Sequence, residues 1–290
     1  MTPARTEPAA RATFTLEPEI IPRPTIEKSA ERLLTGSEFT PDLVQVRGGY
    51  RMRFARTAAD LEAVQRVRYE VFNLELNEGL AASRETGLDQ DQFDAQCQHL
   101  MVIEEATEKV IGTYRLQVSE SANAAEGFYS GQEFDLSGLP PQVLEDSVEL
   151  GRACILREHR DKRVLFLLFS GLTTYLAWNS KRYFFGCSSL TSQDPHEGIA
   201  AYARLLERGQ AWTEFVVAPR AGFACELGDE PLRPINIKIP SLFSIYLRYG
   251  AKICGPPAID REFKTIDFLT LFDRTKIDEH TREILARAGR

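Results

Sequence analysis

The sequence contains no run of about 18 consecutive apolar residues, which a membrane-spanning helix would need. Its first residues include Arg5 and Arg11 but no apolar core of about 7–15 residues before a small-residue cleavage site. We therefore expect neither a membrane-spanning protein nor one secreted through a standard signal. A cytoplasmic location is predicted, with peripheral contact at the inner membrane as an open alternative.

Cysteine and histidine are also scarce. The five cysteines are scattered without a C-x-x-C pair, and no two of the four histidines are at metal-ligand spacing. An acidic loop carries Asp89, Asp91 and Asp94 but lacks the glycine and the terminal glutamate of a calcium-binding loop. These absences argue against a disulfide framework and against zinc hydrolysis, and we predict no metal.

The chain has no excess of positive charge. Its formal net charge is −7, which argues against nonspecific binding of nucleic acid. An anionic partner must therefore meet a local cationic patch. One such corner is REHRDKR at 157–163, between a predicted strand and a predicted helix, where backbone N–H groups and the positive helix end would face an anion. The alternative is an ordinary solvated turn.

Glycine is missing from this turn, which excludes a G-x-G-x-x-G dinucleotide site. The sequence around Cys154, Cys187, Ser188 and Ser189 contains no G-x-S-x-G elbow, and Cys154 on an apolar strand is more simply a core residue. The sequence therefore favours neither a dinucleotide site nor a covalent nucleophile.

What the chain does contain is enough apolar sequence for a full core, with 43% hydrophobic residues in 290. Residues 1–48 are rich in proline, alanine, threonine and charge, and we predict a flexible tail there with a short helix at 26–34. Residues 49–290 are predicted to form one domain. Its expected strands are 50–55, 99–104, 110–118, 148–156, 183–188, 252–254 and 266–272.

Helices are expected from Asp60, with an apolar stripe that includes Val64, Val71 and Leu74, and at 162–179, 195–209 and 239–249. Strand 148–156, helix 162–179 and strand 183–188 follow the order of a parallel pair with its crossover helix. The pattern predicts an α+β fold with a mixed, mostly antiparallel central sheet flanked by helices.

Transfer of an acyl group to an amine needs neither a metal nor a covalent nucleophile. It needs a proton acceptor, donors for the developing oxyanion and a cationic grip on the donor's phosphate. Glu149 heads the central strand and is a candidate base or a polariser acting through water, with a salt-bridging glutamate as the alternative. His99 is a second candidate, for which structural hydrogen bonding is the alternative. Arg152 is expected to pair with an aspartate, because a buried guanidinium requires a carboxylate.

Several motifs resemble one family in order and across roughly residues 50–275. They are RVRYEVF (66–72), DQFDAQCQHL (91–100), IGTYRL (111–116), GFYSGQEFDL (127–136), ELGRACIL (149–156), FFGCSSL (184–190) and YLRYGAKICGPPAIDREFKTID (246–267). Together they look like the bacterial ornithine N-alpha-acyltransferases, the hemolysin-like, acyl-carrier-protein-dependent enzymes of ornithine-lipid synthesis. That family belongs to the N-acetyltransferase (GNAT) superfamily and is similar to the acyl-homoserine-lactone and N-acyl amino acid synthases.

The resemblance implies a GNAT-like fold and no permanently bound cofactor. It implies transfer of a long, commonly 3-hydroxylated fatty acyl group from the phosphopantetheine of acyl-carrier protein to the alpha-amine of an amino acid. Ornithine is the first choice of acceptor, and the product would be a lyso-lipid. The motifs do not separate ornithine from lysine, glycine or glutamine. The residues that match the related synthases, as binding or site-organising residues, are Arg68, Phe72, Asp91, Asp94, Arg115, Glu149 and Arg152.

One departure concerns the donor. The superfamily's coenzyme-A loop, Q/R-x-x-G-x-G/A, is replaced here by residues 157–162 without glycine. Side-chain cations are therefore expected to hold the single phosphate of an acidic carrier protein's arm. The residues predicted for this role are Arg157, His159, Arg160, Lys162 and Arg163.

Two other functions remain as alternatives. A signal synthase would close a homoserine lactone from S-adenosylmethionine and release methylthioadenosine, but the block at 246–267 favours the lipid family. A nonenzymatic acyl-binding or membrane-active protein would consume no amine. The lack of a transmembrane run or a strong amphipathic helix argues against pore formation.

Overall fold

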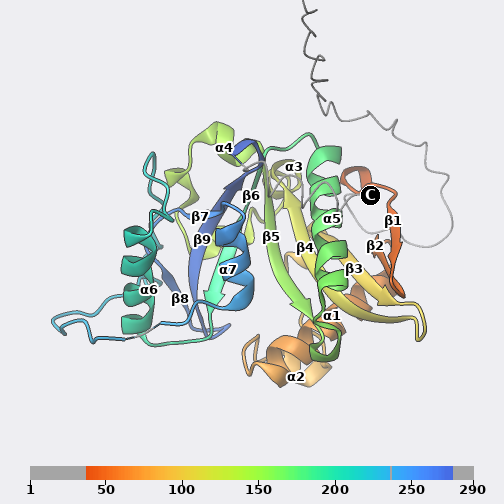
Figure 1. The fold of residues 1–290 in the computed structure, drawn as a ribbon, viewed down its shortest axis with the longest axis horizontal. Helices are drawn as coiled ribbons and strands as arrows, with labels where there is room; N and C mark the ends of the chain where they lie inside the picture. Colours follow the sequence, from red (N-terminus) through yellow and green to blue (C-terminus); the bar gives the residue numbers. More distant parts are fainter. Residues whose placement is uncertain (1–36, 236, 277–290) are drawn as a thin grey trace, which may run out of the picture. The chain divides into compact units, whose positions relative to one another are not determined.

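The computed structural model describes residues 37–235 and 237–276. The chain divides into a short unit, Met1–Ala30, which lies outside the described residues, and a second unit, Glu31–Arg290, which contains all of them. A nine-stranded sheet runs through this second unit in the order β1-β2-β3-β4-β5-β6-β9-β7, and β8 also pairs with β9 (Figure 1). Its strands are β1 Val44–Arg47, β2 Tyr50–Phe54, β3 Gln98–Glu104, β4 Lys109–Val118, β5 Ser147–Ile155, β6 Tyr183–Leu190, β7 Lys252–Ile253, β8 Ala258–Asp260 and β9 Thr265–Asp273.

The pairing is antiparallel throughout the described sheet except between β5 and β6, which are parallel. The predicted α+β fold with a mixed, mostly antiparallel sheet is confirmed. The helices are α1 Ala58–Tyr69, α2 Ser83–Thr86, α3 Ser119–Asn123, α4 Pro141–Glu145, α5 Lys162–Trp178, α6 Pro195–Glu207 and α7 Ser241–Arg248. Within residues 37–235 and 237–276, no helix combines the length and apolar character needed to cross a membrane.

The sheet begins earlier than predicted. Strand β1 pairs with β2 through Val46 and Arg51, so an edge strand lies inside the segment predicted as a flexible tail, and the boundary at residue 48 is too late. Strand β1 is short and mostly exposed, which leaves it without a clear alternation of buried and exposed positions in the sequence. The helix predicted at 26–34 lies outside the described residues.

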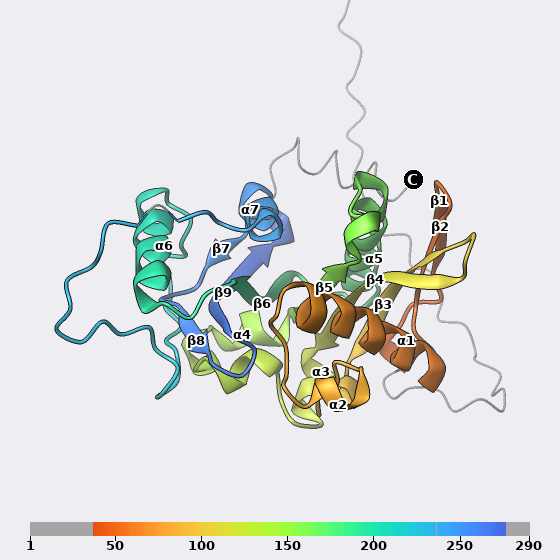
Figure 2. The same ribbon diagram turned by 90° about the horizontal axis from the view of Figure 1, so that it is seen from below.

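Helices cover both faces of the sheet. Figure 2 shows α5, α6 and α7 on one face and α1 to α4 on the other. Alternation along the strands sends neighbouring side chains to opposite faces. Phe268 packs on Phe243 of α7 at 5.7 Å between ring centroids, whereas Phe185 packs on Phe128 of the α3–α4 segment at 4.9 Å. The sheet therefore separates two apolar layers.

Helix α1 starts with a capping box between Thr57 and Asp60 and continues into a π-helical turn at Glu70–Glu75. Extra residues in a π turn rotate the following side chains relative to an α-helix. Val64 and Val71 are buried as predicted, but Leu74 is 65% exposed. The predicted apolar stripe is wrong at its last position, because the helix changes its period there.

Strands β5 and β6 diverge after a short parallel contact. They pair through Ser147–Glu149 and Tyr183–Phe185 alone, although both strands continue beyond that point (Figure 1). Gly186 of β6 packs tightly against β5 just beyond this pairing, since a Cβ atom there would lie 2.1 Å from the carbonyl oxygen of Leu150. The divergence opens the middle of the sheet.

A bulge distorts β5 next to this opening. Thr113 of β4 lies opposite Cys154 and Arg115 lies opposite Gly151, so β5 has one extra residue between them. Arg152, in this extra stretch, has a φ of +49°. Bulges re-aim side chains at sheet openings, and this one brings Arg152 to the face that carries Arg115.

Candidate active site

A cavity of about 330 Å³ occupies the opening between β5 and β6. Residues from both faces of the sheet line it. Apolar side chains from the α5 and α7 face include Phe169, Leu172, Phe184, Phe243, Tyr246 and Phe272. Polar and charged side chains include Glu78, Arg115, Tyr129, Ser130, Glu149, Arg152, Cys187 and Asp267. One continuous space therefore joins an apolar compartment to a charged one.

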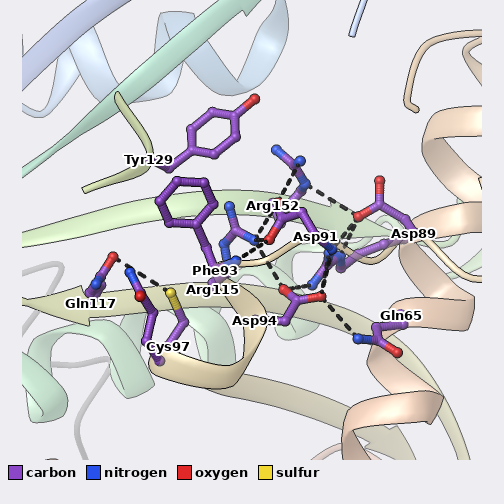
Figure 3. Close-up of polar contacts among 12 residues, drawn as sticks. Gln65, Asp89, Asp91, Phe93, Asp94, Cys97, Arg115, Gln117, Tyr129 and Arg152 are labelled. Atoms are coloured by element: carbon purple, nitrogen blue, oxygen red, sulfur yellow. Dashed lines mark hydrogen bonds and ion pairs between the residues drawn. The ribbon is translucent and has the colours of Figure 1, made fainter. Parts of the chain in front are cut away.

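Three arginines, Arg68, Arg115 and Arg152, and three aspartates form a buried network next to the cavity. Figure 3 shows most of these side chains. Arg68 of α1 donates from Nε to Asp89 Oδ1 at 2.8 Å and from Nη1 to Asp94 Oδ1 at 2.8 Å. Arg68 and Asp89 are fully buried. The formal charges of the six side chains cancel, which is the condition under which ions remain buried.

Arg115 and Arg152 complete this network from two neighbouring strands. Arg115 Nη1 donates to both Asp91 oxygens, at 2.6 and 2.7 Å, and Arg152 Nη2 donates to Asp91 Oδ2 at 3.0 Å. Arg152 Nε also donates to Asp89 Oδ1 at 3.2 Å. Burial alone would raise the pKa of Asp91, but Arg115 and Arg152 more than offset it and lower that pKa. The predicted pairing of Arg152 with an aspartate is confirmed.

Aromatic rings hold the Arg152 guanidinium on the cavity side. The guanidinium carbon lies 4.8 Å from the centre of the Tyr129 ring and 4.5 Å from that of Phe263. Phe72, which also lines the cavity, packs edge-on against Phe263 at 5.3 Å. Cation–π contacts of this kind fix the orientation of an arginine as well as stabilise it.

Glu149 lies where β5 and β6 part. Its Oε1 accepts hydrogen bonds from Ser130 N at 2.7 Å and Ser130 Oγ at 2.6 Å, and its Oε2 accepts one from Tyr129 N at 2.8 Å. Burial raises the pKa of Glu149, and these donors oppose that shift. The carboxylate is thus fixed in position, lines the cavity and binds a proton more readily than an exposed glutamate.

His99 does not reach the cavity. It is fully buried on β3, and its Nε2 lies 3.1 Å from the carbonyl oxygen of Asp94. Burial lowers the pKa of His99 to about 4, although Asp94 opposes the shift. The candidate catalytic role of His99 is not supported by this position, and the structural alternative fits the contacts.

A second acidic group lies on the other side of Ser130. One ligand atom from each of Glu133, Cys187 and Asp267 lies within 4.8 Å of the others. Burial, then Asp267 and Asp260, raises the pKa of Glu133 to about 11. Burial, with Asp260 adding to it, also raises the pKa of Asp267 to about 6. Full ionisation of this group would therefore leave more negative charge than its surroundings neutralise.

The cationic corner at 157–163 is an exposed turn outside the cavity lining. Arg160 forms a two-pronged ion pair with Glu75, at 2.7 Å for both contacts, and Arg157 Nη2 lies 3.2 Å from Glu75 Oε1. His159 is instead partly buried, with Nδ1 3.1 Å from the Tyr50 hydroxyl. Lys162 and the Arg163 side chain are exposed, and Arg163 pairs with Asp161 at 2.7 Å.

One expectation about this corner is wrong. The first amides of α5 were predicted to face an anion, but the Asp161 side chain caps the helix and accepts from Arg163 N at 2.7 Å and Val164 N at 3.1 Å. An aspartate at the N-cap satisfies the same donors that a phosphate would use. Any phosphate held here must therefore contact side chains.

Comparison with known proteins identifies relatives of this chain. A family model described as "Acetyltransferase (GNAT) domain" matches residues 67–170. The L-ornithine N(alpha)-acyltransferase of Rhizobium meliloti (strain 1021) is 34% identical over 238 residues, which cover 78% of this chain and 80% of that protein. The enzyme of the same name from Agrobacterium fabrum is 31% identical over 242 residues, covering 79% of this chain and 83% of that protein.

The chain belongs to the L-ornithine N(alpha)-acyltransferase family. It is therefore an acyltransferase with a GNAT domain. Among solved structures, a coenzyme-A-dependent acyl-homoserine lactone synthase, BjaI, is similar with a TM-score of 0.43 and 15% identity, covering 80% of this chain and 83% of that one.

The candidate site contains some of the predicted residues in its cavity lining and others behind it. Glu149, Arg152, Arg115 and Phe72 line the cavity. Arg68, Asp91 and Asp94 lie in the supporting network. Burial alone would raise the pKa of Asp94, but Arg68 and Arg115 outweigh it and lower that pKa.

Asp89 also belongs to this network; from sequence it was considered only as one of the three carboxylates of the acidic loop, without a partner. It lies 21 positions from Arg68 and 63 positions from Arg152 along the chain. Separations of this size leave no local pattern that would predict the pairing, which is therefore visible only in the tertiary fold.

Sequence reasoning also missed Tyr129, Ser130, Glu133 and Asp267. Their positions lie in the GFYSGQEFDL and EFKTID segments, which were quoted for the family resemblance alone. A polar residue inside a motif that is otherwise rich in aromatic and apolar residues was the available signal. It indicated a site without saying which residues meet there.

Proposed function

We propose that this acyltransferase moves a fatty acyl group from the phosphopantetheine thioester of acyl-carrier protein to the alpha-amine of ornithine. Ornithine is supported by the names of the family members at 29–34% identity. The product would be an N-acyl ornithine, a lyso-lipid. We place the reaction in the cytoplasm, with peripheral contact at the inner membrane.

The observation that carries this proposal is the cavity through the open sheet. Acyl transfer to an amine brings together an apolar chain and a charged amino acid that have opposite requirements for their surroundings. The apolar compartment under α5 and α7 suits the acyl chain, and the compartment with Arg115, Arg152 and Glu149 suits the amino acid. The thioester would lie where the two compartments meet, along β5.

The geometry of β5 supports this placement. Its pairing with β6 stops at Glu149, and beyond the contact of Leu150 with Gly186 the backbone of β5 has no ladder partner on β6. A thioester and its amide arm can use such groups as an added strand would. The corner at the end of β5 offers the side chains of Arg157, Arg160, Lys162 and Arg163 to a single phosphate and to an acidic carrier surface.

In the reaction, the neutral alpha-amine attacks the thioester carbon, the C–N bond forms and the C–S bond breaks. The amine loses one proton and the departing pantetheine sulfur gains one. Glu149 is suited to take this proton, directly or through a water molecule, because it is fixed by three donors and has a raised pKa. Arg115 and Arg152 would hold the acceptor carboxylate without moving, since the aspartates fix both.

The proposal is tested with the purified chain, 3-hydroxyacyl-carrier protein and ornithine, with the released carrier thiol and the N-acyl product measured together. We expect one thiol per N-acyl ornithine. Acyl-coenzyme A in place of the carrier conjugate should react at least about tenfold less efficiently. Equal or better use of acyl-coenzyme A would contradict the carrier assignment.

Two further outcomes separate the alternatives. Release of methylthioadenosine when S-adenosylmethionine replaces ornithine would support a signal synthase. Donor binding with no acylated amine of any kind would support a nonenzymatic acyl-binding protein. To test the corner, the double variant Arg160→Ala and Lys162→Ala should weaken carrier use more at low salt than at high salt, whereas exposed Arg66→Ala should not.

A further inference from the structure

We propose that Glu133 and Asp267 bind the side-chain ammonium of a diamino acid, so that they select ornithine-like acceptors over amino acids with neutral side chains. This inference rests on the proposed acylation of an amino acid. It assigns a specificity role to two residues that are separate from the candidate base Glu149 and from the arginine network.

The two side chains are buried and have few hydrogen-bond donors around them. Glu133 is 2% exposed and Asp267 is 3% exposed. Within the described part of the chain, both oxygens of Glu133 and Oδ1 of Asp267 lack a hydrogen bond of good geometry. The two acids interact with each other, and Asp267 also interacts with Ser189 and accepts through Oδ2 from the Thr265 hydroxyl at 3.0 Å. Buried carboxylate oxygens without donors are costly. When both acids are ionised, these three oxygens match in number the three N–H donors of an alkylammonium group.

The neighbouring charges also favour a cation. Asp260 lies close enough to raise the pKa of both acids, and its own oxygens are occupied by Glu262 N, Phe263 N and the Tyr129 hydroxyl. The positive charge of Arg152 lowers the pKa of Glu133, but its guanidinium is already bound to Asp89 and Asp91. Burial and the neighbouring acids raise the pKa of Glu133 and of Asp267, so an arriving ammonium would take the place of a proton bound by Glu133.

The position within the cavity fits an amino acid with two amines. Asp267 and Cys187 line the same cavity as Glu149 and Arg115, and Glu133 lies within 4.8 Å of the first two. Arg115 Nη2 is buried there and has no hydrogen-bond acceptor in the described part of the chain. An unpaired donor for a carboxylate and unpaired acceptors for an ammonium therefore lie in or directly behind the cavity wall, and the candidate base lines the same space.

A metal ion is the competing occupant, because Glu133, Cys187 and Asp267 have metal-ligating atoms close together. A metal would require the thiolate form of Cys187. Burial beside Glu133 and Asp267 raises the pKa of this thiol well above its usual value, and its Sγ lies 3.5 Å from the Ser130 hydroxyl as a donor. The three carboxylate oxygens without donors fit an ammonium better than this thiol fits a metal.

The test is calorimetric binding of ornithine and of norvaline, which has the same carbon chain without the side-chain amine, to the full chain. We expect the unmodified chain to bind ornithine at least about 100-fold more tightly than norvaline. The preference should fall below about tenfold in Glu133→Gln and in Asp267→Asn. Glu145→Gln, an exposed acid in the same segment, should keep the full preference.

Equal binding of the two amino acids by the unmodified chain would overturn the proposal, and this comparison does not depend on any variant folding. So would an unchanged preference in folded Glu133→Gln and Asp267→Asn proteins. A third contrary result is tight binding of Zn²⁺ that Cys187→Ser abolishes while the ornithine preference stays intact. Acyl transfer is measured separately: if the unmodified chain binds ornithine selectively but acylates nothing, the proposed function fails and the ammonium site stands.

Discussion

Arg115 and Arg152 come from neighbouring strands and meet on one carboxylate, that of Asp91. The meeting depends on the bulge in β5, where Arg152 takes a φ of +49° and turns toward the face of Arg115. Two like charges are held together because Asp89, Asp91 and Asp94 neutralise them from a single loop. The loop, the bulge and the cavity wall therefore form one unit.

Replacement of Arg152 tests this unit. Arg152→Lys retains the charge but cannot donate to Asp89 and Asp91 from a planar fork, so one buried carboxylate oxygen loses its partner. We expect the free energy of unfolding to fall by about 2–4 kcal/mol and kcat/KM to fall more than tenfold. Denaturant unfolding and steady-state kinetics measure the two effects.

The matched control is Arg66→Lys on α1, where the arginine is exposed and pairs with Glu62 one helical turn away. This change should alter stability by less than about 0.5 kcal/mol. An equally small effect for Arg152→Lys would show that the network does not require a guanidinium at this position.

Gly186→Ala tests whether the close contact between β5 and β6 fixes the point at which the two strands separate. The added Cβ would lie 2.1 Å from Leu150 O, so the strands must separate. We expect a loss of about 1–3 kcal/mol, measured as a lower Tm. Gly151→Ala on β5 is the control, because its Cβ would meet nothing within 4 Å, and its Tm should stay the same or rise slightly. Equal Tm values for the two variants would argue against a close contact between the strands at Gly186.

Glu149→Gln tests the proton acceptor. The amide cannot take a proton, so kcat should fall by about 10²–10⁴-fold while the affinity for acyl-carrier protein stays within a factor of about two. Single-turnover kinetics and equilibrium binding separate these quantities, and a thermal melt checks that the contacts with Tyr129 and Ser130 still hold the segment. Equal losses of turnover and carrier binding would refute the base assignment.

The pKa of Glu133 predicts how stability depends on pH. Burial, then Asp267 and Asp260, raises this pKa to about 11 from 4.5, so the folded chain keeps a proton that the unfolded chain releases. Stability therefore falls as the pH rises through this interval, by at most about 1.4 kcal/mol per pH unit. The side-chain amide of the Glu133→Gln variant cannot ionise, so the Tm advantage of this variant over the unmodified chain should grow between about pH 6 and about pH 9.

These melts are recorded without an amino acid ligand, and Glu145→Gln serves as the control because Glu145 is exposed. A constant difference between Glu133→Gln and the unmodified chain across this range would mean that Glu133 ionises normally in the folded state.

Much of the sheet could be predicted from sequence. The apolar strand 148–156, the long apolar helix from Lys162 and the strand from Tyr183 have strong local patterns, and the structure places β5, α5 and β6 there. Strand β1 and the π turn at Glu70–Glu75 could not be predicted. The first is an exposed edge, and the second changes helical period without a local sequence signature.

The site was predictable where a residue breaks a pattern. Arg152 in an apolar strand and Glu149 at its head both stand out, and both line the cavity. Glu133 and Asp267 do not stand out, because one lies in an irregular connection and the other in a strand far along the chain. Their proximity is a product of the tertiary fold. His99 was a candidate because of its residue type. The structure argues against catalysis, because the ring is buried and contacts the backbone of Asp94 instead of lining the cavity.

The most direct measurement of the central claim is mass spectrometry of lipids from cells that express the chain and are fed isotope-labelled ornithine, with labelled lysine, glycine and glutamine in parallel. We predict an N-acyl ornithine that carries the ornithine label, and its loss in cells that express Glu149→Gln. Labelled acyl product from glycine or glutamine but not from ornithine, or no acylated amine at all, would contradict the account.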